Sequence, residues 1–286
     1  MASISDQCEL MDTKFNNIIR DCCNVYGTDI KISTMTILTE CDHEVDLTYI
    51  AEAFNTAKIQ EFIKDVLGDH AIATSKNKRF CNCIIFKVMD KQSVKVFCNG
   101  NLHITGAKTI KEALDISEIF ATMFELMYGG TGIDNMFLVD RFHIQMINLY
   151  FKLPFMSDGG VDAGVDAGVD AGVDAGVDGD ANRRVLSLAH LLKLLQDTTE
   201  YYCNYNNERH AGVIIRMLPV TILIFDSGNV IITAAVTEEL IRRSLAFVFG
   251  FFNKNKDDTS LVISKDDDIY SNKKMKVDYS KYTILK

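Results

Sequence analysis

The sequence has no CxxC pair and no cysteine and histidine ladder at zinc spacing. Its eight cysteines therefore predict neither a disulfide framework nor a metal site, and reduced, mostly buried thiols are expected. None of the six histidines lies in a nucleophile or metal motif. The residues thus predict no catalytic constellation and no cofactor, and we do not expect an enzyme.

The N-terminus lacks the basic, apolar and small-residue order of a signal peptide. The longest apolar runs, such as 246–252, fall far short of the roughly 20 residues that span a membrane. We therefore expect a soluble intracellular protein without a membrane partner. With 286 residues, of which 48% are apolar, the chain can build one large domain or two small ones around a core.

Basic charge is also scarce, since the formal net charge is −9. A nucleic-acid binder needs lysine and arginine to neutralise phosphates, so this value argues against that class. The excess of acidic residues is concentrated in one segment, however, because residues 156–182 contain seven aspartates and no basic residue. Removing these seven charges from −9 leaves −2 for the rest of the chain, which can still carry a basic face.

The first half of the chain alternates helical and strand patterns. Helical spacing of apolar residues over 8–26 predicts an N-terminal helix, and the β-branched run 31–39 predicts a strand. Asp46 is a plausible N-cap for helical periodicity that continues to Leu67. Strand patterns at 81–89, 93–97 and 102–105 surround an Asn99-Gly100 turn, and a capping box at Thr109 and Glu112 opens a helix that ends near Gly129.

The second half repeats this order. Strands are predicted at 142–153, 212–217, 220–225 and 229–233, helices at 185–195 and 237–252, and a turn at Ser227-Gly228. Residues 97–107 align directly with residues 225–235, and each copy precedes its helix. This duplication predicts two similar halves, related by a pseudo-two-fold axis and sharing one continuous sheet.

Two segments lie outside the duplicated unit. Residues 157–181 hold five near-perfect GVDA tetrapeptides, which predict a flexible loop, with a calcium-binding β-roll as the alternative. Residues 253–286 carry many lysines and aspartates and are interpreted as a charged, solvated tail.

The two aligned segments closely resemble the two repeats of TATA-binding proteins. Each has a phenylalanine, a turn ending in glycine, and a strand, and the first copy keeps Thr105-Gly106-Ala107-Lys108. Lys78-Arg79-Phe80, Ser33 to Thr36 and Phe142 to Gln145 are similar to other parts of that family. The resemblance implies an α+β fold in the form of a saddle, with two repeats (30–129 and 137–252), each a curved antiparallel sheet with helices on its convex face. The composition, rich in lysine, isoleucine and asparagine, is similar to the copies that large DNA viruses carry.

The resemblance further implies docking of the concave sheet in the DNA minor groove, with phenylalanine wedges that kink the duplex. The implied wedges are Phe97 with Phe80, and Phe225 with His210 at its partner's position. One departure is that Phe80 to Lys87 is one residue longer than the family spacing, whereas His210 to Arg216 matches it. A core role for Phe97 and Phe225 is the plain alternative, since a phenylalanine in a strand is usually buried.

Other candidate DNA contacts follow from the same resemblance. Phosphate contacts are assigned to Arg79, Lys87, Lys108 and Arg216, with Lys95 as an addition. Thr34 and Met146 stand where central asparagines are expected, and Asn148 could substitute for them. Thr105 and Thr233 complete the candidate set, with good strand formation as their alternative role.

The implied function is a general transcription initiation factor that binds AT-rich promoter DNA and recruits a B-type initiation factor and RNA polymerase. Glu208 and Arg209 are the candidate residues for contact with the B-type factor. The implied compartment is the nucleus or a cytoplasmic viral factory, with packaging in the virion as a further option. Alternatives are a protein-interaction adaptor that has lost DNA wedging and an accessory domain of a nucleic-acid enzyme.

Overall fold

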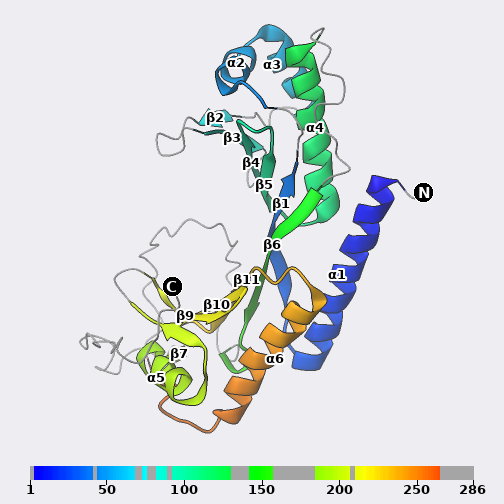
Figure 1. Cartoon of the computed structure of the whole chain (residues 1–286). Coiled ribbons are helices and arrows are strands. Elements are labelled where there is room, and N and C mark those ends of the chain that lie inside the picture. The colour runs from blue at the N-terminus through cyan, green and yellow to red at the C-terminus, as the bar shows by residue number, and fades with distance from the viewer. Residues whose placement is uncertain are drawn as a thin grey trace. The chain divides into compact units, whose positions relative to one another are not determined.

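A computed structural model describes residues 3–40, 44–67, 73–75, 82–88, 92–129, 142–156, 184–206 and 210–264. The chain divides into two compact units. The first unit comprises residues 1–18 and 32–147, and the second comprises residues 19–31 and 148–286. Figure 1 labels most of the elements of the two units, which are described one after the other.

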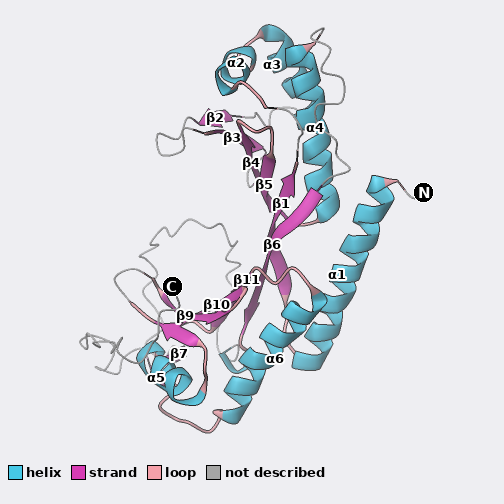
Figure 2. Ribbon diagram, in the orientation of Figure 1, coloured by secondary structure: helices cyan, strands magenta, loops and turns pink. Residues whose placement is uncertain are grey.

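The first unit contains an antiparallel sheet and three helices between and after its strands (Figure 2). Its elements are β1 (Lys31–Thr39), α2 (Leu47–Ala53), α3 (Ala57–Leu67), β2 (Ala73–Ser75), β3 (Cys83–Val88), β4 (Gln92–Phe97), β5 (Leu102–Ala107) and α4 (Ile110–Tyr128). The strand order is β2-β3-β4-β5-β1, so the last strand of the meander pairs with the first strand of the chain.

The second unit repeats this topology. Its elements are β6 (Phe142–Lys152), η1 (Pro154–Met156), β7 (Arg184–Leu186), α5 (Leu188–Thr198), β8 (Tyr202–Asn204), β9 (Gly212–Met217), β10 (Val220–Phe225), β11 (Asn229–Thr233), α6 (Glu238–Lys254) and β12 (Val262–Ser264). Residues 142–147 of β6 are grouped with the first unit. The order β6-β11-β10-β9-β8 is that of the first unit, with β6 in the place of β1 and α6 in the place of α4. The predicted duplication and the α+β class are therefore confirmed.

The N-terminal helix α1 (Ile4–Tyr26) contributes residues to both units. In the first unit the Asp12 carboxylate accepts hydrogen bonds from the backbone amides of Ile110 (2.7 Å) and Lys111 (2.9 Å). In the second unit the Tyr26 ring stacks on Phe249, with centroids 4.2 Å apart. The predicted accessory helix is thus attached through the first turn of α4 and through the side of α6.

One face of each sheet is covered by helices. Alternate strand residues on this face are almost fully buried, and aromatic rings join the layers. Phe86 of β3 packs edge-on against Phe120 of α4, with centroids 5.2 Å apart, and Phe151 of β6 stacks on Phe249 of α6, also at 5.2 Å. The intervening strand residues form the opposite face, here called the open face, and apart from the buried Cys83 and Gly212 they are half-buried or exposed.

Two predicted helices differ from the observed ones. The helical pattern from Asp46 to Leu67 is split at residues 54–56, where the Thr56 side chain donates to the Ala53 carbonyl oxygen at 2.7 Å. Such local bonding competes with helix propagation. The helix expected at 185–195 begins only at Leu188, because Arg184–Leu186 instead forms β7 and pairs with β12.

The charged tail expected to begin at residue 253 is shorter than predicted. Helix α6 continues to Lys254, and the following residues return to α5 and β7. The Leu261 side chain is buried, and the Asp258 carboxylate is hydrogen-bonded to Nε2 of His190 at 2.8 Å. Apolar burial and strand pairing therefore hold residues 255–264 against the second unit, which a charge pattern alone does not reveal. The GVDA tract lies outside the described residues, between η1 and β7.

Among the described helices, none has the length and apolar character needed to cross a membrane.

Candidate nucleic-acid interface

Strand register aligns the same residue types across the open face of each unit. In the first unit Lys87 of β3 lies opposite Ser93 of β4, which lies opposite Thr105 of β5. In the second unit Arg216, Thr221 and Thr233 occupy the corresponding places on β9, β10 and β11. Both basic side chains are exposed. We call each of these sets the basic row of its repeat.

The threonines of the two basic rows are held by equivalent hydrogen bonds. The Thr105 hydroxyl donates to the Ser93 carbonyl oxygen at 3.2 Å, and the Thr233 hydroxyl donates to the Thr221 carbonyl oxygen at 3.4 Å. Each bond joins two neighbouring strands. The structure thus places both predicted threonines on the open face, beside the predicted cations Lys87 and Arg216.

A second row of open-face residues, here called the middle row, runs parallel to the basic row. In the first unit it consists of Ile85, Lys95, His103 and Leu38. In the second unit it consists of Ile214, Leu223, Ile231 and Tyr150. Sequence reasoning named Lys95 only as an additional phosphate contact and missed His103. The alternation of buried Leu102 and Ile104 around His103 is the signal that could have placed it on this face.

Phe97 and Phe225 end equivalent strands at equivalent turns. The amide of Gly100 donates to the Phe97 carbonyl oxygen at 2.9 Å, and the amide of Gly228 donates to the Phe225 carbonyl oxygen at 3.0 Å. Both glycines have positive φ angles, 83° and 79°, as the turn requires. Both rings are half-buried on the open face rather than in the core. Both phenylalanines thus lie outside the helix-covered core, and their role as wedges stays a prediction.

The two rings have different supports. A Cβ placed on Gly212 would approach the Phe225 ring to 3.2 Å and the Ile224 carbonyl oxygen to 2.8 Å, so Phe225 lies over a position that only glycine fits. In the first unit Cys83 lies opposite Phe97 instead. There the Phe97 ring contacts His103, with centroids 4.8 Å apart and planes inclined by 58°.

His210 is exposed two residues before Gly212, and its backbone amide donates to the Asn206 carbonyl oxygen at 2.8 Å. Gly212 lies opposite Phe225, and Cys83 lies opposite Phe97. Counting two residues back in the sequence from these positions leads to His210 in the second repeat and to Cys81, not Phe80, in the first. Phe80 itself lies outside the described residues.

Of the other candidate DNA-contact and partner-contact residues, the structure describes some, and others lie outside the described residues. Lys108 is exposed directly after β5, and its backbone amide donates to Glu112 at 2.7 Å. Asn148 alternates with buried Ile147 and Leu149 and so lies half-buried on the open face of β6. Arg79, Glu208 and Arg209 lie outside the described residues.

The chemistry of the open face is that of a binding surface. The open faces offer exposed cations, hydroxyl groups, aliphatic side chains and aromatic rings. In the described part of the chain, no three His, Cys, Asp or Glu side chains gather as metal ligands. Burial, and secondarily the charge of Lys95, lowers the pKa of His103. Burial also raises the pKa of Cys203 to about 11, which keeps this thiol protonated at neutral pH.

Comparison with known proteins identifies the class to which this arrangement is similar. Residues 186–254, which include α5, β8 to β11 and α6, match the family model described as transcription factor TFIID (or TATA-binding protein, TBP). The resemblance to TATA-binding proteins is thereby confirmed over most of the second repeat. That family consists of non-enzymatic transcription factors.

Among solved structures, the chain is similar to the TBP of Methanococcus jannaschii. The two are 19% identical, the match covers 79% of this chain and 98% of that one, and the TM-score is 0.47. No curated protein matches the sequence.

Proposed function

We propose that this protein is a TATA-binding-protein-like initiation factor that binds promoter DNA in the minor groove through its open faces and bends it. The observation that carries the proposal is the repetition of one residue set at one register. Each repeat presents a phenylalanine beside a glycine turn, a basic residue, and a threonine bonded to the neighbouring strand. Core packing alone would not require the repetition of these side chains on the face opposite the helices.

The residue types suit the minor groove. Its floor offers few groups that distinguish one base pair from another, so apolar side chains and shape make most of the contact there. Phe97 and Phe225 are wedges at the ends of their strands, where a ring can enter between two base pairs. Lys87, Arg216 and Lys108 supply phosphate contacts, which add affinity without sequence preference.

The finer parts of the proposal concern sequence and partners. AT-rich DNA suits the proposal because its minor groove is narrow and strongly negative. Recruitment of a B-type initiation factor and RNA polymerase is assigned to Glu208 and Arg209. The compartment proposed is the nucleus or a cytoplasmic viral factory.

The experiment is Phe225→Ala, measured by energy transfer between dyes at the two ends of a DNA duplex. We expect weaker binding and loss of bending, because unstacking a base step costs a few kcal/mol that the ring must offset. The matched control is Phe247→Ala. Phe247 is also half-buried but lies on α6, against Tyr201 at a centroid distance of 5.1 Å. This control should bend DNA as the wild type does.

Unchanged bending by Phe225→Ala would remove the wedge from the proposal. If the wild type itself neither binds nor bends DNA but captures a B-type factor, the protein is the adaptor instead. The exposed histidine at the position of the second wedge partner is the feature that favours this alternative.

A further inference from the structure

The middle rows of the two repeats differ in chemical kind at two adjacent positions. Lys95 and His103 occupy the first repeat where Leu223 and Ile231 occupy the second. All four side chains are half-buried on an open face. The position on β3 and β9 is isoleucine in both repeats, Ile85 and Ile214. On β1 and β6 the row has Leu38 and Tyr150, and the Tyr150 hydroxyl donates to the Asn229 side chain at 3.1 Å. The cationic and imidazole groups are therefore found on β4 and β5 of the first repeat alone.

Lys95 and His103 form one cluster with the wedge residue of the first repeat. They are directly opposite each other on β4 and β5, and the Phe97 ring lies against the His103 ring. From β1, the residue opposite His103 is Leu38, which is apolar. Among the described residues, Lys95 is the charged group that acts on His103. The cluster therefore combines one ammonium group, one imidazole and one aromatic ring.

The Lys95 ammonium and an imidazole N–H of His103 can donate hydrogen bonds, whereas leucine and isoleucine side chains cannot. In the minor groove, A·T pairs present only acceptors, adenine N3 and thymine O2, while G·C pairs add the donor amino group of guanine. The negative potential of A·T tracts also attracts lysine and histidine into the groove. Phosphate oxygens are acceptors of the same kind at the groove edges.

We propose that Lys95 and His103 donate hydrogen bonds to acceptor atoms of bound DNA, so that the first repeat forms the polar half of the interface and the second repeat the apolar half. This inference rests on the proposed DNA binding and deepens it. A polar and an apolar half recognise different DNA half-sites. The asymmetry therefore fixes the direction in which the protein lies on its site.

The test converts the first repeat to the residues of the second with the double variant Lys95→Leu, His103→Ile. Its binding is compared with that of the wild type on A·T-rich and G·C-rich duplexes. Contact with base acceptors predicts a loss of about tenfold on the A·T-rich duplex and little change on the G·C-rich one. Contact with phosphates predicts an equal loss on both and a decrease of about 0.9 in the salt slope per contact. The reciprocal variant Leu223→Lys, Ile231→His controls for added charge alone.

A pH series separates a contact by His103 from a purely structural role. Burial holds the pKa of free His103 below its usual value, and a bound polyanion raises it. Binding then takes up a proton, so affinity should rise as the pH falls from the bound-state pKa toward the free-state pKa. His103→Ile should abolish this rise, whereas Lys95→Leu should keep it.

The direction in which the protein lies on DNA can be measured with a DNA-cleaving reagent attached to Cys98, an exposed thiol next to Phe97. The control is the Cys98→Ser variant treated with the same reagent, which shows the cuts that come from reagent on other thiols. The wild type should cut on one side of an asymmetric site, and the double variant on both sides.

A double variant that binds A·T-rich and G·C-rich duplexes as the wild type does, with an unchanged pH profile, overturns the inference. DNA bending that still depends on Phe225 would then leave the proposed function intact. Loss of all DNA binding by the wild type would instead remove the proposed function itself.

Discussion

Equivalent positions in the two repeats adopt a left-handed backbone conformation with different residues. Gly106 follows Thr105 with a φ angle of 92°, and Ala234 follows Thr233 with a φ angle of 64°. In the first repeat this residue is the extra one of a bulge, because Met35 pairs with Ala107 and Thr36 with Thr105. A left-handed backbone costs about 1–2 kcal/mol for a residue with a Cβ atom. Ala234 therefore carries strain that Gly106 avoids.

We expect Ala234→Gly to raise the free energy of unfolding by about 0.5–1 kcal/mol, since strain relief exceeds the added entropy of the unfolded chain. Gly106→Ala should lower it by about 1 kcal/mol for the opposite reason. Denaturant unfolding measures both. Gly250→Ala is the control, because Gly250 lies in α6 with open space around it and should gain stability from helix propensity. A lower free energy of unfolding for Ala234→Gly would contradict the inference that Ala234 is strained.

The basic rows give a second prediction at the residue scale. Lys87 and Arg216 occupy the same register, so removing either should weaken DNA binding to a similar degree on all sequences. We expect Lys87→Ala and Arg216→Ala each to reduce the salt slope by about one unit, which a salt titration measures. A slope equal to that of the wild type would make these side chains structural.

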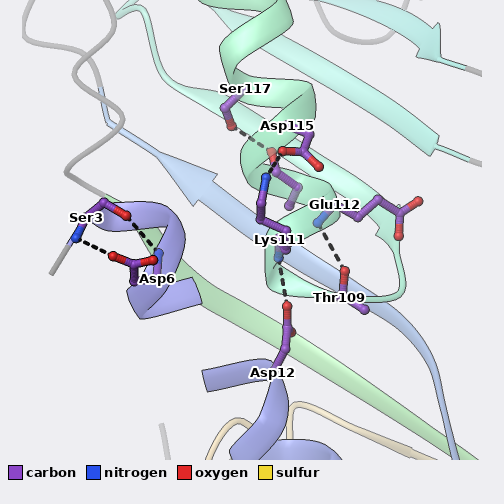
Figure 3. Close-up of polar contacts among 9 residues, drawn as sticks. Ser3, Asp6, Asp12, Thr109, Lys111, Glu112, Asp115 and Ser117 are labelled. Atoms are coloured by element: carbon purple, nitrogen blue, oxygen red, sulfur yellow. Dashed lines mark hydrogen bonds and ion pairs between the residues drawn. The ribbon is translucent and has the colours of Figure 1, made fainter. Parts of the chain in front are cut away.

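At the scale of elements, the N-terminus of α4 is capped from two directions. Thr109 accepts from the Glu112 amide at 3.0 Å, which confirms this half of the predicted capping box. The Glu112 carboxylate, however, reaches the Lys108 amide rather than that of Thr109. The preceding two helix amides are taken by Asp12 of α1, as Figure 3 shows for Lys111. A carboxylate there also complements the helix dipole.

Asp12→Ala should lower the free energy of unfolding by about 2 kcal/mol, because the part-buried backbone amides of Ile110 and Lys111 lose a charged acceptor. Thermal or denaturant unfolding measures the loss. The matched control on the same helix is Asp21→Ala. Asp21 pairs with Arg242 at 3.6 Å and is about half exposed (57%), so its removal should cost under about 1 kcal/mol. Equal effects of the two variants would mean that Asp12 does not act as a cap.

At the scale of the whole molecule, charge is distributed unevenly along the chain. Seven of the acidic residues lie in the GVDA tract and its margins, while the basic rows lie on the open faces. A negative tract tethered to a DNA-binding protein competes with phosphates over about a Debye length, ~8 Å at physiological salt.

Deletion of residues 157–181 should therefore strengthen DNA binding at low salt and have little effect at high salt. The thermal midpoint should not change, because the cost of closing a loop varies slowly with its length. Binding isotherms at two salt concentrations provide the measurement. Equal affinities of the intact and deleted proteins at low salt would identify the tract as an inert spacer.

The sequence by itself determined the repeat. The predicted features that are observed are the strands at 31–39, 220–225 and 229–233, the glycine turns at Gly100 and Gly228, and the N-caps Asp46 and Thr109. These features depend on residues that are near one another in the chain. Local sterics and side-chain period therefore suffice to read them, and the internal alignment of residues 97–107 with 225–235 supplies the duplication.

Only the tertiary structure decided which residues share a row on the open face. Register between strands places Lys87 opposite Ser93 and Ser93 opposite Thr105, and it places Lys95 opposite His103. The capping of α4 by Asp12 and the pairing of β12 with β7 likewise join segments that are far apart in the chain. Spacing along a sequence carries no information about such pairings, because bulges and loop lengths change the register without changing the local pattern.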